Sequence, residues 1–281
     1  MPALLVAITS IQAGAALAKE LFPALGPAGT TGLRAAFAAL LLLAIFRPPL
    51  LRLSRQQWRA VFPYGITVGG MNLAFYFALD RIPLGLAVTL EFVGPLGVAV
   101  LGSRRAADFL WALFAAVGIV LLAPWSGGAA ALDGVGMGLA LFAGACWGAY
   151  IFLGGRLSGV LPHDGQGVAL GMSVAALTVL PFALPAIGNV GLTPRILGIA
   201  LAVAALSSAL PYTLEMVGLR ALPSRTFGIL MSLEPAVATL VGLFFLHETL
   251  GALQWLAVAC VSAASVGSTL TARQPIPPVE A

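Results

Sequence analysis

The sequence predicts an all-α integral membrane protein, a bundle of ten transmembrane helices. The first observation is composition: 60% of the 281 residues are hydrophobic, 9% are charged, and the mean hydropathy is +1.03. Soluble domains carry about a quarter charged residues, so a soluble fold of this size could not bury so much apolar surface. The second observation is length. A spanning helix takes about 20 apolar residues, and short connections leave room for roughly ten helices.

The helices are separated by proline, glycine and charged residues, which interrupt the apolar runs. No connection is long enough to hold a soluble domain. We expect the residues after 271 to form a disordered tail (272–281), because its prolines cannot donate backbone hydrogen bonds. The ten predicted spans are 2–23, 28–47, 58–80, 83–102, 107–124, 134–154, 165–187, 194–220, 223–246 and 250–270.

The distribution of Lys and Arg predicts that both termini are cytoplasmic. With the N-terminus inside, ten basic residues fall in inner loops and three in outer loops, as the positive-inside rule requires. This scatter among loops also argues against nucleic-acid binding, although the net charge is +4. The inner residues are Arg47, Arg52, Arg55, Arg59, Arg104, Arg105, Arg156, Arg220, Arg225 and Arg273, and the outer ones are Lys19, Arg81 and Arg195.

A weak internal repeat divides the chain into two halves, 1–126 and 134–271. Because each half holds five helices, an odd number, the second half must enter the membrane from the opposite side. Inverted repeats of this kind are associated with alternating-access transporters. At an offset of 140 residues the matches are Leu79 with Leu219, Pro83 with Pro223, Leu90 with Leu230 and Pro95 with Pro235, and at 144 Trp111 matches Trp255.

Several long stretches resemble the drug/metabolite transporter superfamily, EamA type, and within it the bacterial threonine/homoserine exporters. The resemblance implies ten helices, a bacterial inner-membrane location and export of small neutral amino acids. The superfamily also exports aromatic amino acids and other metabolites, so these remain alternatives. The stretches are SIQAGAALAKELFP (10–23), GGMNLAFYFAL (69–79), IPLGLAVTLEFVGPLGVAVLGSRRAADF (82–109), ALPYTLEMVGLRALPSRTFGILMSLEPA (209–236) and SAASVGSTLT (262–271).

Four charged residues lie away from the ends of the predicted spans, at positions expected within the bilayer: Arg34, Glu91, Glu215 and Glu234. A charge at mid-bilayer costs about 2.5–3.5 kcal/mol on insertion scales, so each should face a cavity or a partner. An amino acid is a zwitterion, and its transport requires a cation for the carboxylate and an anion for the ammonium. The planar guanidinium suits a carboxylate, so Arg34 is the candidate for the substrate carboxylate. The alternative is a structural ion pair with Glu91 or Glu234.

Glu91, Glu215 and Glu234 are the candidates for the ammonium and for proton coupling. Proline removes the hydrogen bond to the carbonyl four residues earlier, so Pro95 and Pro235 should kink their helices near Glu91 and Glu234. Burial disfavours the charged form of a carboxylate, which suits proton-coupled exchange. Alternatively, the prolines only shape the helices, and Glu215 is solvated at a helix end.

Polar and aromatic residues at interior helix positions complete the predicted site. Asn72 and Tyr76 are four residues apart and share one helix face. Trp147, Tyr150 and Tyr212 could wall a pocket, although such residues also serve as interhelical hydrogen-bonding or interfacial groups. We expect charged residues at the outer helix ends to be solvated: Lys19, Glu20, Asp80, Arg81, His247 and Glu248.

Pairs of glycines four residues apart predict close helix crossings. They are Gly65/Gly69, Gly134/Gly138, Gly144/Gly148 and Gly167/Gly171.

An intramembrane enzyme is the rival class. It would need a nucleophile with a base, or a metal cluster. His163 and His247 both fall in loops, and the chain has no HExxH, GxSxG or GxxxxGK[ST] motif. We therefore expect no catalytic activity, cofactor or metal. The expected partners are an amino-acid substrate, lipid and protons, in a monomer or a weak homodimer.

Overall fold

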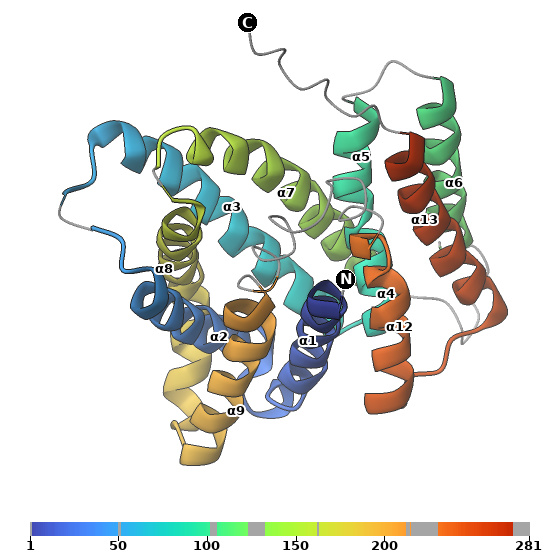
Figure 1. The fold of residues 1–281 in the computed structure, drawn as a ribbon. Helices are drawn as coiled ribbons and strands as arrows, with labels where there is room; N and C mark the ends of the chain where they lie inside the picture. The colour runs from blue at the N-terminus through green and yellow to red at the C-terminus, as the bar shows by residue number, and fades with distance from the viewer. Residues whose placement is uncertain are drawn as a thin grey trace, which may run out of the picture.

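A computed structural model describes residues 2–49, 52–101, 106–122, 133–161, 163–211, 214 and 230–271. The regular elements in these residues are all helices (Figure 1). They are α1 Pro2–Lys19, α2 Phe22–Phe46, α3 Arg55–Leu79, α4 Leu84–Glu91, α5 Val93–Leu101, α6 Ala106–Leu122, α7 Gly134–Ser158, α8 Asp164–Val190, α9 Pro194–Ala204, the π-helical segment η2 Ala205–Ala209, α12 Glu234–Phe245 and α13 Ala252–Thr271.

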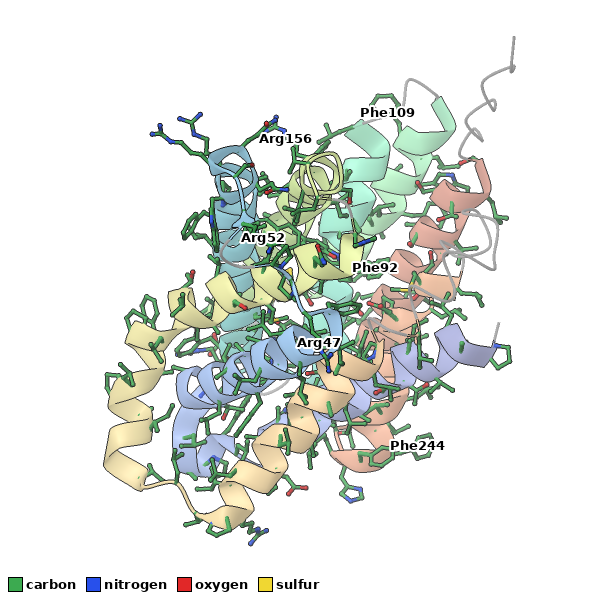
Figure 2. The ribbon with its side chains drawn as sticks, turned by 60° about the vertical axis from the view of Figure 1, so that its left-hand side comes forward. Arg47, Arg52, Phe92, Phe109, Arg156 and Phe244 are labelled. Atoms are coloured by element: carbon green, nitrogen blue, oxygen red, sulfur yellow. The ribbon has the colours of Figure 1, made fainter. Side chains whose placement is uncertain are left out.

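The helices have the length and apolar surface of membrane spans. Five of them, α1, α2, α7, α8 and α13, are long and apolar enough to cross a bilayer. Large apolar side chains cover the outside of the bundle: Phe109 and Phe244 are 67% and 69% exposed, and Phe244 lies at the edge of the view in Figure 2. Phe92, by contrast, lies in the interior. An apolar exterior of this kind is stable only in lipid, so the chain is an all-helical membrane protein.

The predicted fourth span, 83–102, is interrupted. Helix α4 ends at Glu91, and α5 begins at Val93 after a turn at Phe92. Pro95 follows four residues after Glu91 and has no N–H to donate to the Glu91 carbonyl. The interruption therefore lies where the proline removes a backbone hydrogen bond.

The boundary between the first two helices also differs from the predicted one. Helix α1 ends at Lys19, four residues before the predicted end of the span at residue 23. Helix α2 begins at Phe22 and contains a break at Gly26, whose φ of 62° lies in the left-handed region. Glycine adopts this conformation without steric cost. Pro27 then restarts the helix, because proline is favoured in the first helical turn.

The predicted span 194–220 changes its helical pitch. Helix α9 ends at Ala204 and continues as the π-helix η2. The hydroxyl of Ser10 on α1 donates to the carbonyl of Leu206 in η2 at 2.6 Å. A Cβ on Gly14 would lie 3.0 Å from the Ser207 side chain, so α1 and η2 are in close contact. A π-helical turn is uncommon and occurs frequently at functional sites.

The helices form two groups, each built from both halves of the chain. In the first group α2 and α3 pack against α8, α3 also packs against α7, and α2 also packs against α9. In the second group α4 packs against α12, and α6 against α13; Figure 1 shows α5, α6 and α13 side by side. Helices α1 and α7 join the groups, because α1 contacts both η2 and α12 while α7 contacts α3, α4 and α5.

The predicted close crossings form at three of the four glycine pairs. A Cβ on Gly144 would lie 2.5 Å from the carbonyl oxygen of Glu91, and one on Gly65 would lie 2.7 Å from the carbonyl oxygen of Gly171. The Gly134/Gly138 prediction is wrong, because an added Cβ at either position meets nothing within 4 Å. These two positions lie on the open face of α7, whereas Gly136 between them faces Arg81 and Ile82. The amino-acid pattern does not record which helix face is covered.

The expectation that the outer charges are all solvated is wrong for Lys19 and Glu248. They form an ion pair at 2.7 Å, with side chains 25% and 14% exposed. The other oxygen of Glu248 accepts the backbone N–H of Leu84, the first residue of α4, at 2.8 Å. A carboxylate at a helix N-terminus is favourable because it meets unpaired N–H groups and the positive end of the helix dipole. This cluster joins α1, α4 and the loop that follows α12.

Arg81 and Asp133 form a second, more exposed pair at 2.9 Å. Asp133 also caps α7 by accepting the N–H groups of Val135 and Gly136. The hydrogen bonds from Gly136 and Arg81 hold the pKa of Asp133 below its ordinary value. The cap therefore contributes stability above the ordinary pKa of an aspartate, and this stability is lost only as the pH falls through the lowered value.

Candidate functional site

A cavity of about 340 Å³ lies where the two groups of helices meet. Its size is near the lower end of small-molecule sites, which are about 300–1,000 Å³. Seven predicted site residues line it: Arg34, Asn72, Tyr76, Glu91, Trp147, Tyr150 and Glu234. The remaining lining comes from Ile11, Gln12, Ala15, Met71, Phe75, Val88, Met172, Ser207, Pro211 and Met231.

Arg34 is the cation of the cavity and is only 5% exposed. One terminal nitrogen donates to the Ser207 hydroxyl at 3.1 Å, and the other donates to the Asn72 carbonyl oxygen. Asn72 is oriented for this contact because its NH₂ group donates to the Val68 carbonyl at 2.8 Å. The guanidinium also lies 5.0 Å from the centre of the Tyr76 ring, within the range of a cation–π contact.

The hydrogen-bonding partners of Arg34 are therefore neutral. The ion pairs within the described residues are Lys19–Glu248 and Arg81–Asp133. An ion pair of Arg34 with Glu91 or Glu234, the structural alternative, is not among them in the part of the chain that the structure describes. The Nε of Arg34 is buried and has no hydrogen-bond partner there. The guanidinium therefore retains one N–H donor for a ligand.

Glu91 and Glu234 stand at helix ends that meet at the cavity. Glu91 is the last residue of α4 and Glu234 the first of α12, and their exposures are 7% and 4%. The position of Glu234 at a helix N-terminus favours its negative charge. Pro235 follows it in the first turn, where its missing N–H removes no helical bond. Two interrupted helices thus bring two carboxylates to one cavity.

Aromatic side chains form much of the cavity wall. The Trp147 ring meets Phe92 edge-on at 5.4 Å between centroids, and Tyr150 lies 5.2 Å from Tyr64. The Tyr76 ring is 2% exposed, and its hydroxyl has no hydrogen-bond partner among the described residues. These contacts hold the rings against α3, against α7 and against the break between α4 and α5.

A second cavity of about 320 Å³ adjoins the first and shares Trp147 and Met231 with it. Hydroxyl groups line its far side. Ser232 and Ser265 are hydrogen-bonded at 2.7 Å, and the others come from Ser268 and Thr269. The two cavities together give a polar lining that extends past Trp147 toward the C-terminal end of α13.

Two predicted site residues, Tyr212 and Glu215, lie outside the described residues. The sequence did not single out every residue that lines the cavity. Two of the residues it missed, Gln12 and Ser207, carry polar side chains. A signal for Gln12 exists, because it is an amide within an otherwise apolar span. Ser207 has no such signal, since the π-helical turn decides where its side chain lies.

The site can hold a small zwitterion. It offers a guanidinium with neutral partners, two carboxylates from interrupted helices and an apolar wall. Charges inside a membrane protein are expensive and commonly mark a substrate or ion pathway. This geometry provides opposite charges for the two ends of an amino acid within one enclosed space.

Comparison with known proteins agrees with this geometry. A model of the EamA-like transporter family matches residues 134–270. The chain is 47% identical over 271 residues to the threonine/homoserine exporter RhtA of Escherichia coli strain K12, covering 96% of this chain and 91% of the relative. The same values hold for the threonine/homoserine exporter RhtA of Salmonella typhimurium strain LT2.

More distant similarities extend over most of the chain. The uncharacterized transporter YwfM of Bacillus subtilis strain 168 is 26% identical over 226 residues, which cover 78% of this chain and 76% of that protein. A solved crystal structure superposes with a TM-score of 0.62 at 22% identity, covering 98% of this chain and 99% of the other. At that identity the superposition supports the fold alone.

Proposed function

Because the chain belongs to the EamA-like transporter family, we propose that it exports small neutral amino acids, threonine and homoserine among them. The exporters that share 47% identity with it are named for these two substrates. It is a transporter and not an enzyme, a multi-pass protein of the bacterial inner membrane. Its partners are the amino acid, the surrounding lipid and protons, and it works as a monomer or a weak homodimer.

The observation that carries this proposal is the composition of the cavity. Arg34 has neutral partners and a spare donor, so it can bind the substrate carboxylate. Glu91 and Glu234 supply negative charge for the ammonium. Asn72 and Ser207 orient the guanidinium, and Tyr76, Trp147 and Tyr150 enclose the carbon chain.

Alternating access between two inverted five-helix repeats is the proposed mechanism, in a protein of ten spans. The contacts support it through their symmetry. If α7 corresponds to α1, α8 to α2, α9 with η2 to α3, α12 to α4 and α5, and α13 to α6, the contacts fall into equivalent pairs. Helix α1 contacts α9 and η2 as α7 contacts α3, and α1 contacts α12 as α7 contacts α4 and α5. Two equivalent halves around one cavity can rock about it.

Proton coupling is proposed for the carboxylates of the cavity. Glu91 and Glu234 are carboxylates that lie buried at interrupted helices and line the cavity. Each can therefore exchange its proton when the cavity opens to water on one side of the membrane. The substrate ammonium and the proton then compete for the same carboxylate. Glu215 stays a third candidate.

Export of aromatic amino acids or other metabolites is the second candidate function. It is favoured by the rings of Phe75, Tyr76, Trp147 and Tyr150 in the cavity wall. A substrate panel in proteoliposomes distinguishes the two. Threonine and homoserine should exchange with preloaded label, and phenylalanine and tryptophan should not.

Glu91→Gln provides the direct test. Cells that overproduce the protein should lose preloaded labelled threonine and homoserine faster than cells without it. We expect Glu91→Gln to abolish this gain, because the amide can neither neutralise the ammonium nor carry a proton. Transport by the purified variants in proteoliposomes is measured with and without a pH gradient. The comparison distinguishes a loss of substrate binding from a loss of proton coupling.

The matched control is Glu20→Gln, which alters an exposed carboxylate beyond the end of α1. It should export as the unmodified protein does. Normal efflux by a Glu91→Gln variant present in the membrane at wild-type amounts would exclude the role assigned to Glu91.

A further inference from the structure

Three buried polar groups around the main cavity have no hydrogen-bond partner among the described residues. They are the side-chain oxygen of Gln12, the Nε of Arg34 and the hydroxyl of Tyr76. They come from three different helices, α1, α2 and α3, and all three residues line the cavity. An unsatisfied buried polar group is costly, so a ligand that forms hydrogen bonds with these groups gains affinity.

Gln12 differs from Arg34 because its side chain is neutral and both donates and accepts, and it differs from the Tyr76 hydroxyl because its donor and its acceptor are separate atoms. Its side chain is 2% exposed, and within the described part of the chain its amide oxygen has no hydrogen-bond partner. Arg34 only donates and suits a carboxylate, whereas Glu91 only accepts when charged and suits an ammonium. The amide of Gln12 is therefore matched to a neutral group that also donates and accepts. An alcohol is such a group.

We propose that Gln12 binds the side-chain hydroxyl of the substrate and thereby sets a preference for hydroxylated amino acids. The inference rests on the proposed function and names the specificity determinant of the same site. The amide donates to the hydroxyl oxygen and accepts the hydroxyl proton, so one residue serves both a β- and a γ-hydroxyl. Met71, Met172 and Met231, which also line the cavity, supply pliable apolar surface for the rest of the side chain.

Gln12→Met tests this assignment with little risk to the fold. Methionine has a similar length, and the change removes an unsatisfied buried amide without opening a cavity. The purified protein in liposomes is loaded with homoserine, and counterflow of labelled homoserine is measured against external competitors. L-Threonine is compared with L-valine, in which a methyl group replaces the hydroxyl, and L-homoserine with L-norvaline on the same basis.

We expect the unmodified protein to prefer each hydroxylated member of a pair. In Gln12→Met the threonine-to-valine preference should fall about tenfold, because a site that binds a hydroxyl discriminates through that hydrogen bond. Valine itself should compete as before. Gln166→Met is the matched control. Its side-chain oxygen also has no partner, but it lies on α8 outside the cavity, so the preference should not change.

Gln12→Asn provides a second measurement that does not depend on the methionine variant. Its amide is retracted by one methylene, so the longer arm of homoserine should reach it better than threonine does, and the preference should shift toward homoserine. An unchanged threonine-to-valine ratio in Gln12→Met, equal weakening of both competitors, or no shift in Gln12→Asn would overturn the assignment. Unmodified protein that exchanges amino acids without preferring the hydroxyl overturns only this inference. Unmodified protein that exchanges no amino acid overturns the proposed function itself.

Discussion

At the residue scale, the site depends on a buried cation whose hydrogen-bond partners are neutral. Arg34 is held by two neutral groups, Ser207 and Asn72, which use its terminal nitrogens but leave Nε without a partner. A buried charge without compensation is costly, and removing its counterpart is strongly destabilising in ordinary proteins. Here we expect the substrate carboxylate to provide the compensation during transport.

Arg34→Lys should therefore weaken substrate binding while keeping the positive charge. Lysine lacks the planar fork and cannot contact Ser207, Asn72 and a carboxylate together. Loss of one charge-assisted hydrogen bond costs about 1.5–3 kcal/mol, which corresponds to roughly 10–100-fold in affinity. The measurement is the concentration dependence of threonine counterflow. The control is Arg195→Lys, at an exposed position in the first turn of α9, and unchanged affinity in Arg34→Lys would contradict the assignment.

At the scale of the elements, the position of Glu91 depends on a crossing between α7 and the α4–α5 break. At this crossing glycines let the two backbones come into direct contact. A Cβ on Gly94 would lie 1.8 Å from the Gly144 carbonyl oxygen, and one on Gly144 would lie 2.5 Å from the Glu91 carbonyl oxygen. Helix α7 therefore contacts the backbone at the interruption between α4 and α5. The interruption itself comes from Pro95, but its distance from the cavity is set by the two glycines.

Gly144→Ala should destabilise the protein and lower transport together. The added methyl group must push the α4–α5 interruption away from α7, and overpacking of this kind costs about 1–3 kcal/mol. Gly138→Ala, in the same helix, is the matched control because nothing lies within 4 Å of its added Cβ. Alanine is the better helix former by up to about 1 kcal/mol, so the control should be as stable as the unmodified protein or more so.

Thermal unfolding of the purified variants in detergent and homoserine counterflow in liposomes measure the two effects. If Gly144→Ala and Gly138→Ala behave alike in both assays, the crossing does not position Glu91.

At the scale of the whole molecule, the two groups of helices each contain elements from both halves of the chain. An inverted second half would produce this interleaving, because equivalent helices would then meet across a pseudo-twofold axis. The contacts of α2 with α8 and of α6 with α13 follow this pattern. Neither half could bury its apolar and polar faces alone. We expect the halves to fold and function only together.

The proposed opposite orientation of the halves has a topological consequence. In a Cys146→Ala, Cys260→Ala background, a membrane-impermeant maleimide applied to spheroplasts should label Arg81→Cys and Arg195→Cys. It should not label Arg52→Cys or Arg156→Cys until the membrane is permeabilised. All four positions are exposed, so access depends on the side of the membrane. Labelling of Arg156→Cys from outside would mean that the halves run in the same direction.

The sequence alone determined the membrane class, the approximate helices and most of the charged and aromatic residues that line the cavity. These features are local: the hydropathy of a window decides whether it spans a bilayer, and a charge within such a window is conspicuous wherever the chain folds. Arg34, Glu91 and Glu234 could be singled out in this way, before any neighbour was known.

Only the tertiary structure decided which groups meet. The contact of Arg34 with Asn72 and Ser207, the pairing of Lys19 with Glu248 and the place of Gln12 in the cavity all join residues from different helices. Hydrophobic periodicity marks a helix as buried but does not specify the neighbouring helix, its rotation or its distance. Those quantities depend on packing at glycine crossings and on breaks such as Gly26 and η2, and they arise only when the helices assemble.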